Sequence, residues 1–218
     1  MRNNSNKPVI LLGAGGHAKV LLDVLRLEQQ VLLGLVTPDL EKGSKHLGLE
    51  VLGDDEVLKK YNPSDIELVN GIGSLPFQKL RWSVSDKVRS WGFTLSKVIH
   101  PSAIISADVM LDEGVQVMPG CVIQPGCSIG RDSIINTGSV IDHDCEIGEN
   151  THIAPGCVLS GGVNVGKLAH IGTGSRIIQD IKVGEGAVVA AGTTLYKDVE
   201  ADMLIKQPNT LQQKRIEV

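Results

Sequence analysis

The chain of 218 residues is long enough for one large domain or two small ones, and its net charge of −4 at pH 7 gives no basic surface of the kind that binds nucleic acid. Aromatic residues make up only 3% of the chain whereas glycine occurs 25 times, which favours a thin, regular structure with a core of small and aliphatic side chains. No apolar run approaches the roughly 20 residues of a membrane span and no signal peptide is recognisable. We therefore expect a cytoplasmic protein whose four cysteines stay reduced.

The first part of the chain alternates between strand-like and helix-like patterns. Short apolar runs predict strands, apolar residues at helical spacing predict helices, and Asp54 is placed to cap a short helix. This alternation predicts a small Rossmann-like α/β domain over residues 1–97. In chain order we expect a strand at 9–12, a helix at 17–29, a strand at 31–36, a short helix at 54–60, a strand at 66–69 and a helix at 76–91.

A glycine turn follows the first expected strand. Gly13, Ala14, Gly15 and Gly16 lead directly into a helix, and Gly13-x-Gly15-x-x-Ala18 fits a loose dinucleotide-binding fingerprint. Such a turn lets a ligand approach the backbone closely and offers a helix N-terminus to a phosphate, although many similar turns are only structural. The domain is half the usual size for a dehydrogenase, and no acidic residue directly ends the second strand. A dehydrogenase is therefore disfavoured.

After His100 the period changes to six residues. Aliphatic side chains occupy every sixth position from Ile99 to Leu195 without a gap, and small residues or valine recur four residues after nearly all of them. A triangular parallel β-helix explains this period, because each side of each coil repeats the same inward-pointing pair. We predict this fold over residues 98–218, including a C-terminal tail. All four cysteines fall in the inward series, so we expect them to act as small apolar fillers and not as metal ligands or disulfides.

Three histidines are predicted to point outward from the coil. His143 is flanked by Asp142 and Asp144, and a neutral imidazole beside a carboxylate suits a general base near pH 7. The alternative is an ordinary surface histidine. His152 and His170 are one coil of 18 residues apart and should stack, which suggests the zinc site of hexapeptide carbonic anhydrases. Such a site needs three converging histidines, and His143 lies half a coil away and faces elsewhere within one chain. We therefore expect no metal.

Three stretches occur together in this order: Leu11-Leu12-Gly13-Ala14-Gly15-Gly16-His17-Ala18-Lys19-Val20, His100-Pro101-Ser102-Ala103 and Ile141-Asp142-His143-Asp144-Cys145. With the six-residue repeat, they resemble the hexapeptide-repeat nucleotide-sugar N-acetyltransferases of the bacillosamine and sialic-acid pathways. The resemblance extends from Val9 to about Val199. It implies a left-handed parallel β-helix, acetyl-CoA as co-substrate and a homotrimer.

The resemblance also implies roles for individual residues. His143 would be the general base and Asp144 its carboxylate partner. Acetyl-CoA would contact His152, a backbone N–H near Gly161 that stabilises the oxyanion, Thr173 and Ala191. The C-terminal element that usually contacts CoA is replaced by residues 206–210, so we expect no contact from the tail. The nucleotide sugar would contact Gly13, Ala14, Gly15, Gly16, His17, Thr37, Pro38, Asp39, Gly71, Ile72, Gly73, Ser74 and Asn136.

The function predicted from these residues is acetyl transfer from acetyl-CoA to the amino group of a nucleotide-linked amino sugar, implied to be a UDP-4-amino-4,6-dideoxy sugar. The amine would attack directly, because no nucleophilic residue shows convincing activation. No insertion interrupts the repeat to build a pocket, so the site should form between subunits of a trimer. The alternatives are O-acetylation of a sugar or sialic acid, and a non-catalytic nucleotide-sugar-binding trimer.

Overall fold

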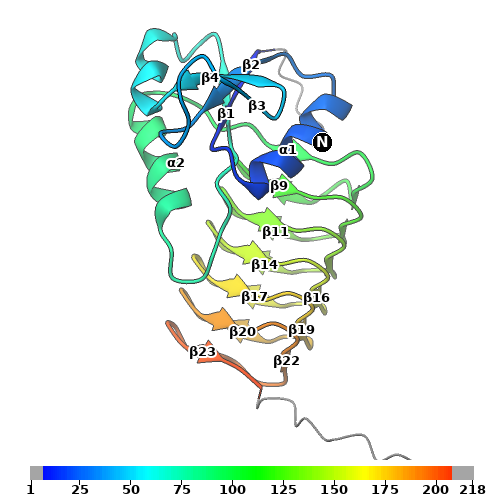
Figure 1. Ribbon diagram of the computed structural model, residues 1–218. Coiled ribbons are helices and arrows are strands. Elements are labelled where there is room, and N and C mark those ends of the chain that lie inside the picture. Colours follow the sequence, from blue (N-terminus) through cyan, green and yellow to red (C-terminus); the bar gives the residue numbers. More distant parts are fainter. Residues whose placement is uncertain (1–6, 208–218) are drawn as a thin grey trace, which may run out of the picture.

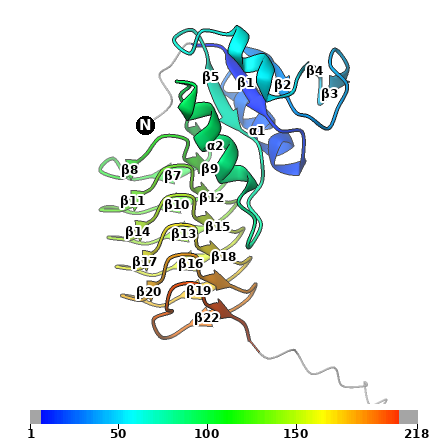
Figure 2. The same cartoon turned by 90° about the vertical axis from the view of Figure 1, so that its left-hand side faces the viewer.

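A computed structural model describes residues 7–207. An α/β part stands on one end of a long triangular solenoid, as Figure 1 shows. Figure 2 shows helix α2 (Leu80–Ser90) lying beside the upper coils of the solenoid, so the α/β part covers one side of the coil as well as its end. No helix among these residues is long and apolar enough to cross a membrane.

The α/β part contains a five-stranded sheet in the order β3-β4-β2-β1-β5. Strand β1, next to the edge strand β5, pairs in parallel with β2 on one side and with β5 on the other. Chain order reverses direction at β1, and the carboxyl end of such a strand is where α/β proteins place their ligands. The strands are β1 (Val9–Leu12), β2 (Leu32–Val36), β3 (Lys45–His46), β4 (Leu49–Gly53) and β5 (Glu67–Asn70).

The helices agree with the sequence prediction except in one place. Helix α1 spans Gly16–Leu27, and Asp54 accepts a hydrogen bond from the backbone of Glu56 at the start of a 3-10 helix at Asp55–Lys60. Helix α2 begins at Leu80, so the prediction of a start at residue 76 was wrong. Phe77 has a left-handed backbone with φ of 64°, which a helix does not allow. Residues 71–79 instead form a loop that descends beside the solenoid (Figure 1).

The hairpin of β3 and β4 was not predicted. Its first strand is only two polar residues long, and Gly48 turns the chain with φ of 80°. Pairing with β2, and not an apolar pattern, defines this edge of the sheet.

The solenoid has three parallel faces with seven, six and five strands, and all its strands have two residues. The first face holds β6 (Val98–Ile99), β9 (Gln116–Val117), β12 (Ile134–Ile135), β15 (His152–Ile153), β18 (His170–Ile171), β21 (Val188–Val189) and β23 (Leu204–Ile205). The second holds β7 (Ile104–Ile105), β10 (Val122–Ile123), β13 (Val140–Ile141), β16 (Val158–Leu159), β19 (Arg176–Ile177) and β22 (Thr194–Leu195). The third holds β8 (Met110–Leu111), β11 (Ser128–Ile129), β14 (Glu146–Ile147), β17 (Asn164–Val165) and β20 (Lys182–Val183).

The predicted register of the repeat is confirmed. The second residue of nearly every solenoid strand is buried, and all four cysteines are free and buried in the core. Glycines spaced by 18 residues stack between coils: a Cβ on Gly130 would lie 2.6 Å from the backbone nitrogen of Glu149. The repeat ends in a shortened coil, where Val199 pairs with Val183. Of the atypical C-terminal element, residues 208–210 lie outside the described range.

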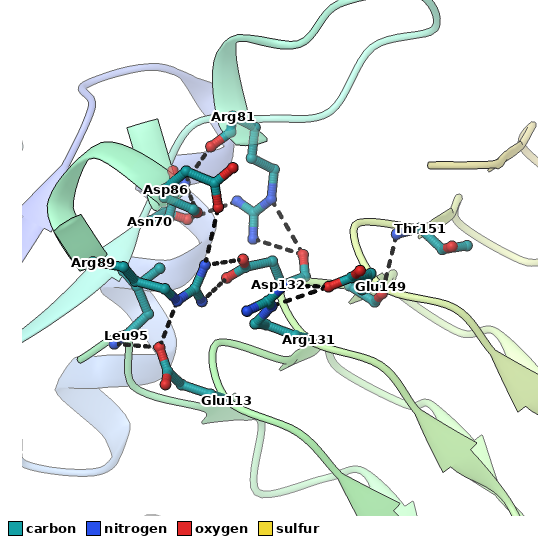
Figure 3. A network of polar contacts seen from close by, with 12 residues as sticks. Asn70, Arg81, Asp86, Arg89, Leu95, Glu113, Arg131, Asp132, Glu149 and Thr151 are labelled. Carbon is teal, nitrogen blue, oxygen red and sulfur yellow. Dashed lines mark hydrogen bonds and ion pairs between the residues drawn. The ribbon is translucent and has the colours of Figure 1, made fainter. Parts of the chain in front are cut away.

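A buried ion pair fastens helix α2 to the solenoid, as Figure 3 shows. Arg89 forms two hydrogen bonds of 2.6 and 2.8 Å with the carboxylate of Asp132, and its Nε donates to Glu113 at 2.9 Å. The Asp132 side chain is only 1% exposed. Such bidentate pairs fix geometry as well as charge, so the α/β part is held in one position on the coil.

Candidate active site

The candidate base, His143, lies at the corner between the second and third faces, between β13 and β14. Its Nδ1 is 2.8 Å from Oδ2 of Asp144, and both side chains are exposed. The hydrogen bond to Asp144, assisted by the charges of Asp142 and Asp144, raises the pKa of His143 above its usual value of 6.5. The arrangement can accept a proton at Nε2 and stabilise the resulting imidazolium.

Gly161 occupies the same corner one coil later, directly beneath the His143 ring. A Cβ on Gly161 would lie 2.5 Å from Cε1 and 2.6 Å from Nε2 of His143, so no larger residue fits under the ring. Within the described part of the chain, no hydrogen bond uses the N–H of Gly161. The candidate base and an unused backbone donor therefore lie side by side, which is the pairing that acyl transfer requires.

A second group of predicted residues lies at the corner between the first and second faces. Asn136 follows β12, and its Nδ2 is 3.1 Å from Nε2 of His152 on the next coil. Its Oδ1 accepts a hydrogen bond from the N–H of Thr137 at 2.8 Å, which fixes the orientation of the amide. Nδ2 therefore donates to His152, and its other hydrogen remains to be used.

His152 is buried, which the outward register did not predict. It does point away from the coil, but its Nδ1 lies 3.1 Å from the backbone oxygen of Ser74 in the loop that descends from the α/β part. Because a carbonyl oxygen only accepts, His152 is the Nδ1–H tautomer. Burial, together with the neighbouring His170, lowers the pKa of His152 from 6.5 to about 3. His152 is therefore neutral, and both of its ring nitrogens are occupied.

The predicted stacking of His152 on His170 is confirmed, with the two rings perpendicular and their centroids 4.8 Å apart. Among the described residues, no three histidine, cysteine or acidic side chains are grouped so that they could hold a metal ion.

The remaining residues predicted to contact acetyl-CoA, Thr173 and Ala191, are exposed and lie one coil apart in the column that continues below Thr137, next to that of Asn136. The N–H of Gly192 donates to the carbonyl of Thr173 and fixes this stacking. The structure thus places Asn136, Thr173 and Ala191 along one corner and His143 with Gly161 along another. Within one chain the predicted site is divided.

The glycine turn lies at the carboxyl end of β1. Gly13 has φ of 88°, and its N–H donates to the carbonyl of Val36 at 2.7 Å. Helix α1 starts immediately afterwards, with no side-chain cap at Gly15 and no acidic residue in its first turn. A Cβ on Gly15 or Gly16 would meet nothing within 4 Å. The helix N-terminus is therefore open to an anion.

The loops after β2 and β5 flank this turn, as expected. Thr37 is buried at 2% exposure, and its hydroxyl accepts from the N–H of Asp39 at 3.3 Å. Thr37 and Pro38 line a hollow of about 400 Å³. Gly71 packs against the turn so closely that a Cβ would lie 2.7 Å from the carbonyl of Leu12. Ile72, Gly73 and Ser74 continue from Gly71 toward His152.

Two residues at this site were missed in the sequence. Arg81 is buried and donates to the carbonyl of Asn70 at 2.8 Å (Figure 3). It also donates to the carbonyl of Ile72 at 2.7 Å, and burial lowers its pKa to about 10. Gln116, 1% exposed, bonds to His17 and to Asn70. A polar Gln116 at an outward position of the coil is ordinary in sequence, and only the docked α/β part makes it notable.

Comparison with known families finds two models that match different parts of the chain. Residues 8–88 match the PglD N-terminal domain, and residues 102–143 and 126–161 match the bacterial transferase hexapeptide (six repeats). No match was found among curated protein sequences.

Solved structures extend the similarity over nearly the whole chain. PerB from Caulobacter crescentus, solved in complex with CoA and GDP-perosamine, is 38% identical, with 92% of this chain and 94% of PerB covered and a TM-score of 0.84. The acetyltransferase domain of PglB from Neisseria gonorrhoeae FA1090, in complex with acetyl coenzyme A, is 29% identical, with 92% and 96% covered and a TM-score of 0.84.

These features define an acyltransferase of the hexapeptide-repeat class. The chain belongs to the nucleotide-sugar N-acetyltransferase family that combines a PglD-type N-terminal domain with hexapeptide repeats. The predicted enzyme class and overall architecture are confirmed, and acetyl-CoA or CoA is bound in structures of relatives.

Proposed function

We propose that this enzyme transfers the acetyl group of acetyl-CoA directly to the amino group of a nucleoside-diphosphate amino sugar, with His143 as general base. The observation that carries the proposal is the close packing of the His143 ring, held by Asp144, over Gly161, whose N–H makes no hydrogen bond in the described part of the chain. As the amine nitrogen attacks the thioester carbon, a C–N bond forms and the amine loses a proton to His143. The tetrahedral intermediate then collapses, the C–S bond breaks, and the CoA sulfur takes the proton from the His143 imidazolium, so that CoA leaves as its thiol and His143 becomes neutral again.

Gly161 and Asn136 have the donors that the acyl group needs. The N–H of Gly161 would stabilise the oxyanion, which is commonly a large catalytic contribution. Asn136 would donate its remaining amide hydrogen to the acyl group or to the sugar. The neutral His152 would hold Asn136 in place. Thr173 and Ala191 would line the path of the CoA chain along the exposed corner.

The glycine turn would hold the diphosphate. The open N-terminus of α1 attracts negative charge, and the buried cation of Arg81 lies beneath the adjoining loop. Residues 37–39 and 71–74 would complete the nucleotide-sugar site. The sequence predicted a UDP-linked sugar, whereas the relative at 38% identity was solved with GDP-perosamine. We therefore take a GDP-linked amino sugar as the first substrate to test and a UDP-4-amino-4,6-dideoxy sugar as the second.

We also propose that a complete site needs a neighbouring subunit of a homotrimer. Two corners of one chain carry the two halves of the predicted site. The second face, which lies between these corners, presents an apolar outward column to solvent: Ile104 is 67% exposed and Val158 is 41% exposed, with Val122 and Val140 between them. A neighbouring coil that covers this column would bring His143 of one subunit to the Asn136 corner of the next.

The activity is tested by incubating the protein with acetyl-CoA and each of the two nucleotide sugars. Thiol release measures turnover, and a control without nucleotide sugar corrects for the enzyme's own cysteines, all four of which are buried. Product mass spectrometry and stability to mild base distinguish an amide from an ester. An alkali-stable acetylated nucleotide sugar is expected. Binding of acetyl-CoA without acetylation of either sugar would contradict the proposed substrate class, and an alkali-labile product would indicate O-acetylation.

The arrangement between subunits is tested by mixing chains. Inactive His143→Ala chains and inactive Asn136→Ala chains should regain part of the activity when mixed, because some interfaces then combine two intact halves. Light scattering should show a trimer. No recovery in mixed trimers would contradict a shared site.

A further inference from the structure

Gln116 occupies the junction between the solenoid and the nucleotide-sugar part of the enzyme. It lies on β9 in the first face, points out of the coil, and is 1% exposed because the α/β part covers it. Its Nε2 donates to the carbonyl of Asn70 at 2.8 Å, and its Oε1 lies 2.6 Å from Nε2 of His17. One amide thus contacts the end of β5 and the first turn of α1.

These two bonds fix the hydrogen position on His17. The carbonyl of Asn70 only accepts, so the amide nitrogen of Gln116 must face it and the amide oxygen must face the histidine. His17 Nε2 therefore carries the hydrogen and donates it. Burial, together with the positive charge of Arg81, lowers the pKa of His17 from 6.5 to about 4. The ring is neutral at physiological pH, and its Nδ1 has only a lone pair.

Nδ1 of His17, the ring nitrogen without a partner in the described part of the chain, lies at the N-terminus of helix α1. His17 is the second residue of α1, directly after the glycine turn, and its ring is only partly buried. Within the described range of the chain, no hydrogen bond uses Nδ1. The surrounding helix N-terminus provides donors, which suit the phosphate oxygens of a nucleotide sugar. A neutral acceptor beside them suits a hydroxyl or amino group of the same ligand and disfavours a phosphate oxygen.

We propose that Gln116 is a positioning residue of the nucleotide-sugar site, which holds His17 as the Nε2–H tautomer so that Nδ1 accepts a hydrogen bond from a hydroxyl or amino group of the sugar. The identity of the ligand rests on the function proposed above. The tautomer does not, because the contacts among Gln116, His17 and Asn70 lie within the chain itself.

The first test examines the tautomer in the ligand-free protein. Nitrogen NMR of labelled histidine should show His17 as a neutral Nε2–H ring, and Gln116→Met should redistribute the hydrogen between the two nitrogens. An exposed glutamine at a solenoid corner gives the matched control, because Gln179→Met should leave the His17 signals unchanged. An Nδ1–H ring in the unaltered protein would overturn the proposal, whatever the substrate proves to be.

The second test measures the consequence for binding. Gln116→Met should raise KM for the nucleotide sugar about tenfold, the scale of one lost hydrogen bond, while affinity for GDP or UDP alone and KM for acetyl-CoA stay unchanged. A purely structural role would instead lower the melting temperature and weaken all ligands together, and that result would overturn the proposal. So would an unchanged KM.

Two substitutions of His17 serve if Gln116→Met does not fold. Asn places an oxygen near the position of Nδ1 and retains the acceptor, whereas Gln reaches the position of Nε2 and retains only the bond to Gln116. His17→Asn should therefore bind the nucleotide sugar more tightly than His17→Gln. The reverse order would overturn the proposal. If the unaltered protein bound neither nucleotide sugar, the proposed function would fail while the tautomer measurement remained valid.

Discussion

The two corners of the solenoid that carry the proposed site are built from the same six-residue repeat, but their histidines have opposite environments. At the corner of His143 the ring is exposed, and its carboxylate partner raises its pKa. At the corner of Asn136 the loop from the α/β part covers His152, and burial lowers its pKa to about 3. The first histidine is suited to accept a proton during turnover, and the second is suited to stay neutral and hold a neighbour. The two pKa values differ because the loop at residues 71–79 covers His152 and leaves His143 exposed, and not because of the repeat itself.

The largest effect is expected from removing His143, the proposed base. His143→Ala should lower kcat by about 10²–10⁴-fold with little change in acetyl-CoA affinity, because a general base acts mainly in the transition state. Gln179→Ala, at the same corner two coils later, should leave kcat unchanged. Steady-state kinetics and calorimetry provide the measurement, and near-normal turnover would contradict the assignment of His143.

The attachment of the α/β part to the solenoid should depend on the ion pair between Arg89 of α2 and Asp132. Arg89→Met leaves the carboxylate of Asp132 buried and unpaired, which should cost about 3 kcal/mol in the free energy of unfolding. Urea denaturation measures this. Arg89→Lys keeps the charge but loses the bidentate geometry, so its loss should be smaller. Equal stability of all three proteins would show that the ion pair does not fasten the two parts.

Steric access to the base can be tested with a single methyl group. Gly161→Ala should displace the His143 ring and lower kcat about a hundredfold, since a Cβ would lie 2.5 Å from Cε1. In the His143→Ala background the ring is absent, so the same substitution should have a much smaller effect, limited to the oxyanion donor. A double-mutant cycle measures this difference, and full additivity would mean that the two residues act independently.

The smallest effect concerns the carboxylate beside the base. Asp144 raises the pKa of His143, so Asp144→Asn should lower that pKa and move the acid limb of kcat/KM to lower pH. The plateau should fall about tenfold, because the imidazolium loses its partner. Asn tolerates the left-handed backbone of residue 144, whose φ is 58°. Asp142→Asn, with no ring contact, should give a smaller shift of the acid limb. A shift to higher pH would contradict the pairing.

The fold and register of the solenoid could be predicted from the sequence, because each coil repeats the same local pattern of inward-pointing residues. The inward positions from Ile99 to Leu195 determine the register, and the register places His143 with Gly161 and His152 over His170. It did not predict the burial of His152 or the role of Gln116. Both depend on where residues 70–74 pass the coil, and that contact joins positions 46 to 78 residues apart in sequence. The start of α2 was misplaced for a related reason, because residues 71–79 form the descending loop.

The contrast between the two histidines is tested most directly by following both rings in an NMR pH titration of the ligand-free enzyme. We predict that His143 titrates above 6.5, and that His152 remains neutral in the Nδ1–H form down to a pH of about 3. Titration of His152 near neutral pH, or of His143 below 6.5, would contradict the assignment of His143 as the base and of His152 as the neutral ring that holds Asn136.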